Sequence, residues 1–581
     1  MVRKMKNILL QFDFKQTSDE DSVVFTDPLY MITANKLDEV EFCMEQIERA
    51  VQDGYYVAGY FSYEVAYSFY DVDIKHQNES MPLLSFGVFS SPTSIPRSEI
   101  FGEYHVTNWN MKVTKDDYEK SFQRVMEAIE NGVTKQVNYT VPFEASFTGN
   151  SYQYYQDLKN AQQSLYSAYL RFEDMDILSV SPELFFHYKE DTIKVRPMKG
   201  TVKRGKTFEE DQQHYTYLRS SEKDRYENKL ITTLMTKELE QVAEKDSIHV
   251  TEAFTVEKYP TVYQMTSTIV GKVSDSITVT ELFKRLFPCG SISGTPKKAT
   301  LQLIANVEPY PRHVYCGAIG YFSPNNEAIF NVPIRTVVID QQNGIATYGA
   351  GGAITGKSTV EGEYEEVHTK TSVLTYREPP FELIETIGLQ DGKWLYLNEH
   401  KERLQDSATY FDFALSLDKL DTILQQYEEK YPTGLFRLRC LFHPNGNITH
   451  EIFPLKATNN AKVVLASSNI DSNNPFLFHK TTNRSFYEAF QQDDYFDTLL
   501  WNEHGEITEF TIGNVVIEVD GEKFTPPVTS GLLNGTFRRG LVRDGIVKEK
   551  VLFKEDITSA DAIWFINSVR EWIKVELVIN N

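Results

Sequence analysis

A chain of 581 residues is too long for one small module, because compact domains hold roughly 100–200 residues each. Hydrophobic residues make up 41% of it and charged residues 24%, which is typical of a chain that folds around extensive cores. The 59 Lys and Arg residues against 82 Asp and Glu residues give a formal net charge of −23, so the chain has no general attraction for nucleic acid or an anionic membrane surface. We expect an enzyme-sized globular protein that binds no nucleic acid and no membrane.

The N-terminal sequence and the cysteines bear on location. The apolar run in MVRKMKNILLQFDF is too short for the core of a signal peptide, and no stretch approaches the ~18 apolar residues of a transmembrane helix. Cys43, Cys289, Cys316 and Cys440 are widely scattered and form no metal-binding pattern. We therefore expect a reduced, cytoplasmic protein.

The first strong helix signal along the chain follows Thr114. Thr114-x-x-Asp117 is a variant of the capping box that begins many helices. After it, apolar side chains recur at helical spacing over residues 118–129. We expect a helix there with one face in the core.

Strand signals dominate the rest of this region. Residues 135–147 and 176–188 alternate apolar and polar side chains, as half-buried strands do. Residues 317–340 predict a hairpin that turns at Pro324-Asn325-Asn326. Together with the helix, these strands predict a large antiparallel α+β fold.

A domain boundary is predicted at Glu378-Pro379-Pro380. Consecutive prolines stop a helix, and here they separate a helical pattern from a strand-like run over residues 381–388. We expect one domain over residues 1–378 and a smaller one over residues 381–581, each large enough to fold by itself.

Two polar features of the first domain suggest chemistry. Lys199 lies in the segment RPMKGT, bounded by Pro197 and Gly200, and follows Glu183 by a distance that suits two neighbouring strands. Glu363, Glu366 and Lys370 have the spacing of one helix face. Taken singly, each feature is more often a solvated surface group, because lysine and glutamate are rarely buried.

A third feature is the run of small residues Gly349-Ala350-Gly351-Gly352. Small residues allow backbone N–H groups to approach an anion closely. Alone, this run could equally be a tight turn.

Considered together, these features resemble the chorismate-binding enzyme family. The resemblance rests on eight segments in order: QVNYT at 136–140, SPELFF at 181–186, RPMKGT at 196–201, DRYEN at 224–228, FPCGSISGTPKK at 287–298, YCGAIGY at 315–321, IRT at 334–336 and EGEYEEVHTK at 361–370. It implies a large antiparallel-sheet domain that binds chorismate.

Lys199 decides which branch of that family the chain resembles. Branches that act at C2 to make anthranilate carry alanine at this position, whereas the branch that aminates C4 carries lysine. The resemblance implies that Lys199 attacks C2 of chorismate and displaces the C4 hydroxyl, after which ammonia enters at C4. It also implies that Glu183 protonates the departing hydroxyl.

The family resemblance further implies a metal site and a substrate site. Mg²⁺ would be bound by Glu227 and Glu366, with Glu363 as an additional acceptor close by. The substrate carboxylate would meet a second group of residues: Tyr315, Arg335, Gly351, Lys370 and Thr201. We expect Tyr315 and Arg335 on the two strands of one hairpin. Gln264 is a departure, because several relatives have histidine there.

The second domain resembles the fold-type IV pyridoxal-phosphate enzymes, which include 4-amino-4-deoxychorismate lyase. The order of its polar segments carries the resemblance. It implies a cofactor site made of Arg403 for the phosphate, Lys480 for the covalent bond to the cofactor, Glu509 for the pyridine nitrogen, and Thr536, Asn567 and Ser568 around the phosphate.

The two resemblances imply consecutive reactions. The first domain would convert chorismate and ammonia to 4-amino-4-deoxychorismate, and the second would eliminate pyruvate from it to give p-aminobenzoate for folate synthesis. The chain contains no GxCxGxQ-like motif of a glutamine amidotransferase, so we expect ammonia from a separate subunit. We also expect a homodimer formed through the second domain.

Two alternatives remain at this point. The first domain could act at C2, as anthranilate and isochorismate synthases do, beside an aminotransferase-like domain. The second domain could instead be a non-catalytic assembly platform. Lys199 argues against the first alternative.

Overall fold

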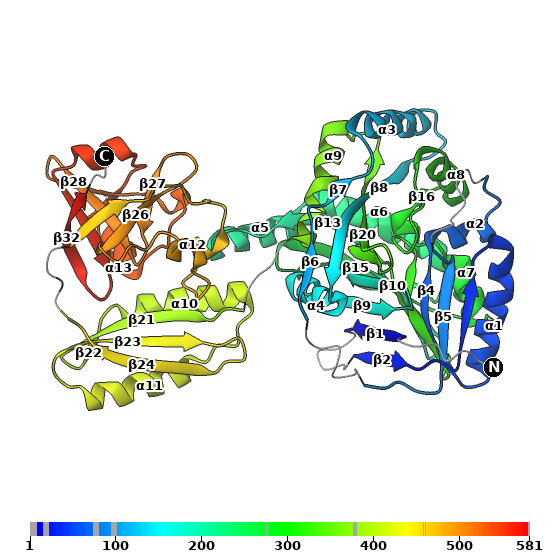
Figure 1. The fold of residues 1–581 in the computed structure, drawn as a ribbon, viewed down its shortest axis with the longest axis horizontal. Helices are drawn as coiled ribbons and strands as arrows, with labels where there is room; N and C mark the ends of the chain where they lie inside the picture. Colours follow the sequence, from blue (N-terminus) through cyan, green and yellow to red (C-terminus); the bar gives the residue numbers. More distant parts are fainter. Residues whose placement is uncertain are drawn as a thin grey trace. The chain divides into compact units, whose positions relative to one another are not determined.

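The computed structural model describes residues 8–15, 22–73, 81–94, 102–274, 277–375, 380–456, 458 and 461–578. The chain divides into two compact units (Figure 1): unit 1 comprises Met1–Lys203 and Thr216–Glu378, and unit 2 comprises Arg204–Tyr215 and Pro379–Asn581. Residues 1–7 of the predicted N-terminal segment and residues 378–379 of the predicted boundary lie outside the described residues. The domain limits 1–378 and 381–581 stay a prediction, and unit 2 differs from them by including Arg204–Tyr215.

Unit 1 contains two ten-stranded sheets within the described residues. The first sheet has the order β16-β8-β20-β19-β10-β9-β1-β2, and β6 and β7 also pair with β8. Its strands are β1 (Leu9–Phe14), β2 (Val23–Thr26), β6 (Tyr104–Val106), β7 (Asn110–Met111), β8 (Gln136–Gly149), β9 (Tyr166–Arg171), β10 (Met175–Ser181), β16 (Gly294–Thr295), β19 (Thr336–Asp340) and β20 (Ile345–Thr355).

The second sheet of unit 1 has the order β13-β15-β12-β11-β18-β17-β4-β5-β3, and β14 also pairs with β15. Its strands are β3 (Tyr30–Ala34), β4 (Tyr56–Phe61), β5 (Leu84–Phe89), β11 (Leu184–Lys189), β12 (Thr192–Arg196), β13 (Met198–Lys203), β14 (His249–Lys258), β15 (Val262–Lys272), β17 (Ala318–Ser323) and β18 (Glu327–Asn331). The described pairs in both sheets are antiparallel.

The helices of the first part of the chain are α1 (Val40–Gln52), α2 (Ala66–Phe69), α3 (Lys115–Glu130), α4 (Ser151–Gln162), α5 (Phe208–Ser220), α6 (Glu222–Leu239), α7 (Val279–Leu286), α8 (Lys297–Val307) and α9 (Val360–Thr369). Helices α3 and α9 pack on β20, α1 packs on β3 and β4, and α6 packs on β13 and β15 (Figure 1). The predicted cap of α3 is present, because the Thr114 hydroxyl accepts the backbone N–H of Asp117.

Two hairpins position residues of the candidate site, and the second of them was predicted from the sequence. Strands β11 and β12 pair with Leu184 opposite Arg196, so Glu183 and the start of RPMKGT lie at the same end of that hairpin. Lys199 itself lies on β13, which pairs with β15. Because β15 and β12 lie between β13 and β11, the expectation that Glu183 and Lys199 belong to two neighbouring strands is wrong. Strands β17 and β18 form the other hairpin, and Asn326 in its turn has a φ of 58°.

Unit 2 contains two sheets within the described residues. One has the order β22-β21-β23-β24, and the other has the order β27-β26-β25-β32-β31-β28-β29-β30. Their strands are β21 (Leu383–Gln390), β22 (Lys393–Trp394), β23 (Leu435–Phe442), β24 (Ile448–Pro454), β25 (Lys462–Leu465), β26 (Asp497–Trp501), β27 (Ile507–Phe510), β28 (Gly513–Val519), β29 (Glu522–Thr525), β30 (Lys548–Glu549), β31 (Ala562–Asn567) and β32 (Glu571–Val578).

The remaining helices of unit 2 are α10 (Leu397–Phe411), α11 (Leu417–Lys430), α12 (Ser485–Glu488), α13 (Thr536–Arg543) and α14 (Lys554–Ser559). Helix α10 packs on β21, and α13 packs on β31. The predicted fold class, a large antiparallel-sheet α+β unit followed by a smaller α+β unit, is confirmed.

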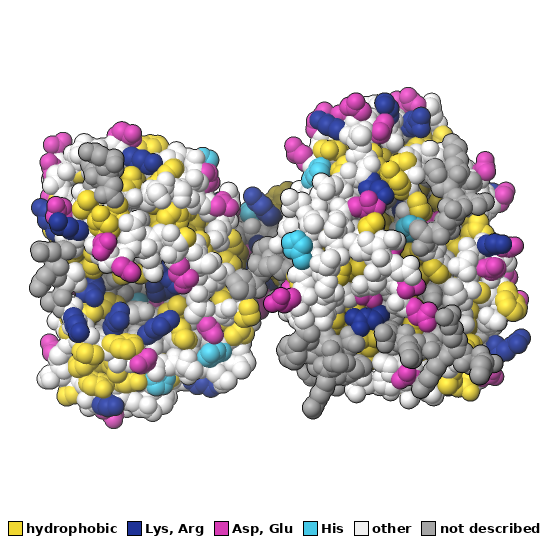
Figure 2. Space-filling model, viewed as in Figure 1, with side chains coloured by type: hydrophobic (Ala, Val, Ile, Leu, Met, Phe, Trp, Pro, Cys, Tyr) yellow, Lys and Arg dark blue, Asp and Glu magenta, His cyan; other side chains and the backbone are white. Residues whose placement is uncertain are grey.

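The surface and the cysteines agree with a protein that folds around closed cores. Figure 2 shows acidic and basic side chains interspersed over the face in view. All four cysteines are buried, and the described residues contain no disulfide. Among the described helices, none has both the length and the apolar character needed to cross a membrane.

Candidate functional site

The irregular part of strand β13 that carries Lys199 is held by three side-chain hydrogen bonds. The Asn228 amide donates to the Lys199 carbonyl at 3.2 Å, and the Gln264 amide donates to the Gly200 carbonyl at 2.8 Å. The Thr201 hydroxyl donates to Oε1 of Gln264 at 2.7 Å. Gly200 has a φ of 96°, a conformation that glycine adopts readily. Gln264 therefore holds the part of β13 that follows Lys199.

Glu183 is a buried acid with one strong hydrogen bond. The Ser291 hydroxyl donates to Oε1 of Glu183 at 2.6 Å, and the Glu183 side chain is otherwise removed from water. Burial raises the pKa of Glu183 to about 7, and the Ser291 hydrogen bond opposes that rise. Glu183 can therefore hold a proton near neutral pH.

Lys370 pairs with a carboxylate of α9. Lys370 Nζ is 2.6 Å from both Oε1 of Glu366 and the Gly351 carbonyl oxygen. Burial raises the pKa of Glu363, while Lys370 and Lys199 oppose the rise. Glu366 and Lys370 thus form an ion pair on α9 beside Gly351, and the grouping of Lys199 with the α9 carboxylates stays a prediction.

Glu363 and Glu366 suit a divalent cation bound through oxygen. One Glu363 oxygen accepts the Ser358 hydroxyl at 2.7 Å, and its Oε2 is buried without a hydrogen-bond partner. Mg²⁺ commonly uses one or two carboxylates and completes its coordination with water and substrate. The two carboxylates of α9, Glu363 and Glu366, fit this mode of coordination.

Glu227 lies on a different helix from the other two predicted metal ligands. It lies half-buried on α6, next to Asn228, whose amide binds the Lys199 carbonyl. Among the described residues, no three or more His, Cys, Asp or Glu side chains gather at one point, so Glu227 is not brought together with Glu363 and Glu366 in such a group. The role of Glu227 as a second metal ligand stays a prediction.

Tyr315 and Arg335 flank the β17–β18 hairpin, so the expectation that they lie on its two strands is wrong. Tyr315 comes before β17, and Arg335 follows β18 with a φ of 53°. Arg335 donates to the Gln162 side chain at 2.6 Å, and burial holds the pKa of Arg335 below its usual value. Sequence patterns gave no signal for Gln162, because it lies at the end of α4, far from Arg335 along the chain.

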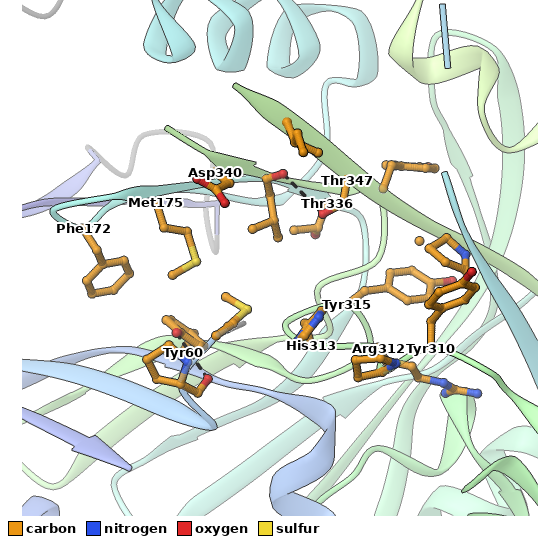
Figure 3. Close-up of a pocket in the computed structure, with 18 of the residues that line it drawn as sticks. Tyr60, Phe172, Met175, Tyr310, Arg312, His313, Tyr315, Thr336, Asp340 and Thr347 are labelled. Atoms are coloured by element: carbon orange, nitrogen blue, oxygen red, sulfur yellow. Dashed lines mark hydrogen bonds between the residues drawn. The ribbon is translucent and has the colours of Figure 1, made fainter. Parts of the chain in front are cut away.

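The Tyr315 ring lies against the backbone of Gly349. A Cβ at position 349 would lie 2.4 Å from the Tyr315 ring, so only glycine leaves room for the ring. A cavity of about 880 Å³ lies against these residues (Figure 3). Figure 3 shows His313 and Tyr315 between Tyr60 and Met175 on one side and Tyr310 on the other.

The cavity is not the predicted site. Tyr315 is the one predicted site residue among those that line it, and Lys199, Glu183 and the α9 carboxylates lie elsewhere. Of the predicted residues of unit 1, Tyr315 alone thus borders this cavity, and a common site for the others stays a prediction.

Lys480 is the central residue of the second site. Burial, together with the charges of Arg484 and Arg403, lowers the pKa of Lys480 to about 7. The Ile384 N–H donates to the Lys480 carbonyl at 2.9 Å. A lysine that is partly neutral near pH 7 can act as a nucleophile.

The predicted phosphate residues meet around a buried carboxylate that the sequence analysis missed. Arg403 binds both oxygens of Glu385, at 2.9 and 2.6 Å. His400 joins the network, with Nδ1 2.6 Å from Glu385 and Nε2 3.0 Å from the Ser568 hydroxyl and 3.4 Å from that of Thr536. Although burial alone would raise it, the Arg403 and His400 charges hold the pKa of Glu385 at about 2.

Asn567 shapes the neighbouring turn. Its side-chain oxygen accepts the backbone N–H groups of Val569 and Arg570, at 3.1 and 2.8 Å. It therefore holds the loop that carries Ser568.

Glu509 is buried and hydrogen-bonded. It accepts the Tyr487 hydroxyl at 2.5 Å and the Leu533 N–H at 3.1 Å, and burial raises its pKa to about 7. Tyr487 was not predicted, since nothing in the spacing links it to Glu509.

The donor set of unit 2 fits pyridoxal phosphate. Gly535 precedes α13, and Thr536 begins it, so an anion can approach the helix N-terminus. Arg403 supplies a cation and Lys480 an amine of lowered pKa.

Two family descriptions match the chain. The chorismate binding enzyme family matches residues 96–376, and amino-transferase class IV matches residues 382–578. Unit 1 thus carries a chorismate-binding fold and the second part of the chain a class IV fold. The resemblance to both families is confirmed.

Among curated relatives, aminodeoxychorismate synthase component 1 of Escherichia coli (strain K12) is 33% identical over 315 residues, which cover 53% of this chain and 69% of that protein. The protein of the same name from Salmonella typhimurium is 37% identical over 264 residues, which cover 45% of this chain and 58% of its own length. The match thus spans little more than half of the Salmonella relative. The chain belongs to the chorismate-binding enzyme family.

A solved structure supports the same fold. Anthranilate synthase component I from Streptococcus pneumoniae TIGR4 superimposes with a TM-score of 0.53 at 21% identity, covering 64% of this chain and 91% of that one.

Proposed function

We propose that the chain makes p-aminobenzoate from chorismate in two steps. Unit 1 would aminate chorismate at C4 to give 4-amino-4-deoxychorismate and water. Unit 2 would split that product into p-aminobenzoate and pyruvate. The observation that carries the proposal is the buried, protonatable Glu183 at the end of the hairpin from which the segment with Lys199 continues. The names of the two curated relatives support the first step.

The amination would proceed by two displacements. The Lys199 amine forms a bond to C2 while the bond from C4 to its hydroxyl breaks, and Glu183 gives its proton to the departing oxygen. Ammonia then bonds to C4, the bond from Lys199 to C2 breaks, and the amine is regenerated. A pKa near 7 suits Glu183 for this role, because about half of it is protonated at neutral pH.

Substrate binding would use the opposite charges of the predicted site residues. Mg²⁺, held by Glu366 with Glu363 and Glu227 nearby, would neutralise one carboxylate of chorismate. Arg335, Tyr315, Lys370, Thr201 and the Gly351 backbone would bind the other. The buried Oε2 of Glu363 supports a cation there.

Partners and location complete the proposal for unit 1. Ammonia would come from a separate glutamine amidotransferase subunit, which the wording "component 1" in the relatives' names supports. The first reaction belongs to the transaminase class of transferases and the second to the carbon–carbon lyases. A homodimer through unit 2 and a cytoplasmic location stay predictions.

Bound pyridoxal phosphate would supply an electron sink for breaking a bond next to the amino group. Lys480 would hold the cofactor and move the proton at the reacting carbon. Arg403, Thr536 and Ser568 would bind its phosphate, with Asn567 holding the Ser568 turn. Glu509 would face the ring nitrogen, and its carboxylate in the ionised form would keep that nitrogen protonated; the Tyr487 hydroxyl and the Leu533 N–H hold the carboxyl group in place for this role.

Two arginines of β23 would bind the carboxylates of the second substrate. Leu383 is bridged to Thr481 and Ile384 to Lys480, so the side chains of Lys480 and Ile384 face the same side. The β21–β23 register places Arg439 opposite Thr386 and Arg437 opposite Gly388, on that same side. Both arginines are exposed.

Replacing Lys199 by alanine tests the first step. Lys199→Ala should reduce formation of aminodeoxychorismate from chorismate and ammonium below about a tenth of the wild-type rate, because the nucleophile is lost. The same protein should still split added aminodeoxychorismate, since that step uses unit 2. A variant that kept most of its amination rate would exclude covalent catalysis by Lys199.

Borohydride reduction tests the second site. Reduction of the full-length protein with pyridoxal phosphate should leave a phosphopyridoxyl group on the peptide that contains Lys480. Lys480→Ala should lose both the label and the visible absorbance of the cofactor, while Lys401→Ala should keep both. A label on another lysine would overturn the assignment, and no label at all would favour the assembly-platform alternative.

A further inference from the structure

Unit 2 is built from two separate stretches of chain. The class IV match begins at residue 382, yet Arg204–Tyr215 also pack within unit 2. This short stretch, called the strap below, lies inside the range that matches the chorismate binding enzyme family. Nothing in class IV chemistry by itself requires such a segment.

The strap is anchored by a buried ion pair. Arg204 binds both oxygens of Asp211, at 2.6 and 2.8 Å, and the Gly205 N–H donates to Asp211 at 2.9 Å. The Arg204 side chain is 7% exposed and that of Asp211 1%. A paired charge can be this deeply buried only when its geometry is fixed, because an uncompensated one is very costly.

The strap is bonded to helix α10 through Tyr410. Arg204 donates to the Tyr410 carbonyl at 2.9 Å, and the Tyr410 hydroxyl donates to the Gly205 carbonyl at 2.8 Å. The Lys206 ammonium lies 3.4 Å from the Ser472 carbonyl. The strap thus binds both the backbone carbonyl and the side-chain hydroxyl of Tyr410, which restrains the position of the ring.

The fixed ring continues into a stack that ends next to Lys480. The Arg204 guanidinium lies 4.4 Å from the centre of the Tyr410 ring, and that ring lies 4.2 Å from the His479 ring. The Ser407 hydroxyl is 3.0 Å from Nδ1 of His479. Burial lowers the pKa of His479 to about 3, so the ring packs as a neutral group.

Because His479 and Lys480 are consecutive residues of an extended segment, the position of the His479 ring determines the direction of the Lys480 side chain. Successive residues of an extended segment point to opposite faces. With Thr481 bridged to Leu383 and the Lys480 carbonyl bound by Ile384, His479 points toward α10 and Lys480 to the opposite face. Fixing the His479 ring therefore fixes the direction in which the Lys480 side chain leaves the backbone.

We propose that the strap is a positioning element of the second site: Arg204 and Asp211, through Tyr410 and His479, hold the peptide that presents Lys480 to the cofactor. This inference rests on the proposed role of Lys480. It makes the second site complete only when a segment of the chorismate-binding sequence is in place.

Substitutions in the full-length protein test the proposal. Arg204→Gln and Asp211→Asn should each weaken pyridoxal phosphate binding at least fivefold, measured by titrating the apoprotein at the visible absorbance of the cofactor. Both should also shift the pH midpoint of that absorbance. Lys401→Gln, which removes another ion pair of α10, with Asp421, should change cofactor affinity by less than twofold.

Two variants of Tyr410 separate positioning from folding. Tyr410→Leu removes the stack and should weaken cofactor binding as Arg204→Gln does. Tyr410→Phe removes the bond to Gly205 but keeps the ring between Arg204 and His479, and should weaken cofactor binding clearly less than Tyr410→Leu does. If Arg204→Gln does not fold, this pair still decides the question.

The outcomes distinguish the inference from the function beneath it. Wild-type cofactor affinity and pH midpoint in Tyr410→Leu would overturn the role of the strap, as would equal losses in Tyr410→Leu and Tyr410→Phe. Failure of borohydride to label Lys480 in the wild-type protein would instead overturn the proposed second site.

Discussion

Glu183 shows how burial and one hydrogen bond together set the protonation of a single side chain. Burial makes the charged form costly, and the Ser291 hydroxyl recovers part of that cost because it donates to the carboxylate. A raised pKa means that the protonated form is fully present well below about pH 7 and is lost as the pH rises through that value.

The amination rate should follow this titration. If Glu183 is the acid, kcat/KM for chorismate should fall as the pH rises through about 7, with free ammonia held constant from about pH 6 to about pH 9. Ser291→Ala removes the opposing hydrogen bond, so the midpoint should move upward by about one unit. Ser291→Thr keeps a hydroxyl and should stay near wild type. An unmoved midpoint in the alanine variant would remove Ser291 from this role.

Sequence motifs predicted some site residues and missed others for a physical reason. Lys199 and Glu183 stand inside short segments whose local pattern is informative. Ser291 and Gln162 reach Glu183 and Arg335 only through the fold, 108 and 173 residues away along the chain. Such contacts leave no mark on periodicity or spacing.

At the scale of elements, strand β20 packs closely against the segment before β17, because Gly349 has no side chain where the Tyr315 ring lies. A Cβ on Gly349 would lie 2.4 Å from the Tyr315 ring, closer than nonbonded atoms approach. Gly349→Ala should therefore displace Tyr315, raise KM for chorismate about tenfold and lower the free energy of unfolding by about 1–3 kcal/mol.

A second glycine supplies the matched control. Gly356 follows β20, and the nearest atom to a Cβ there is Cγ2 of Ile129 at 3.8 Å, an ordinary contact. Gly356→Ala should leave KM and stability near wild type in the same steady-state and thermal unfolding measurements. A wild-type KM in Gly349→Ala would show that Tyr315 does not contact the substrate.

Local signals predicted elements better than they predicted where elements belong. The Thr114 cap and the turn at residues 324–326 are encoded within a few residues, and both are present. The assignment of Arg204–Tyr215 to unit 2 depends on the buried pair of Arg204 with Asp211 and on its contacts with Tyr410. Hydrophobic periodicity reports which face is buried, and it does not report against which unit.

At the scale of the whole molecule, the acidic composition and the length of the chain each predicted a feature of the fold. An acidic chain without a basic field must bind an anionic substrate through local cations, and the predicted cations Arg335, Lys370 and Arg403 are individually placed by hydrogen bonds or ion pairs. The length predicted more than one core, and each unit has its own.

The measurement that tests the central claim most directly is product analysis of the full-length protein. Purified protein is incubated with chorismate, ammonium, Mg²⁺ and pyridoxal phosphate, and products are separated by chromatography before mass analysis, because p-aminobenzoate and anthranilate are isomers. The account predicts p-aminobenzoate and an equal amount of pyruvate, with aminodeoxychorismate as the intermediate. Formation of anthranilate, isochorismate or salicylate in place of p-aminobenzoate would contradict it.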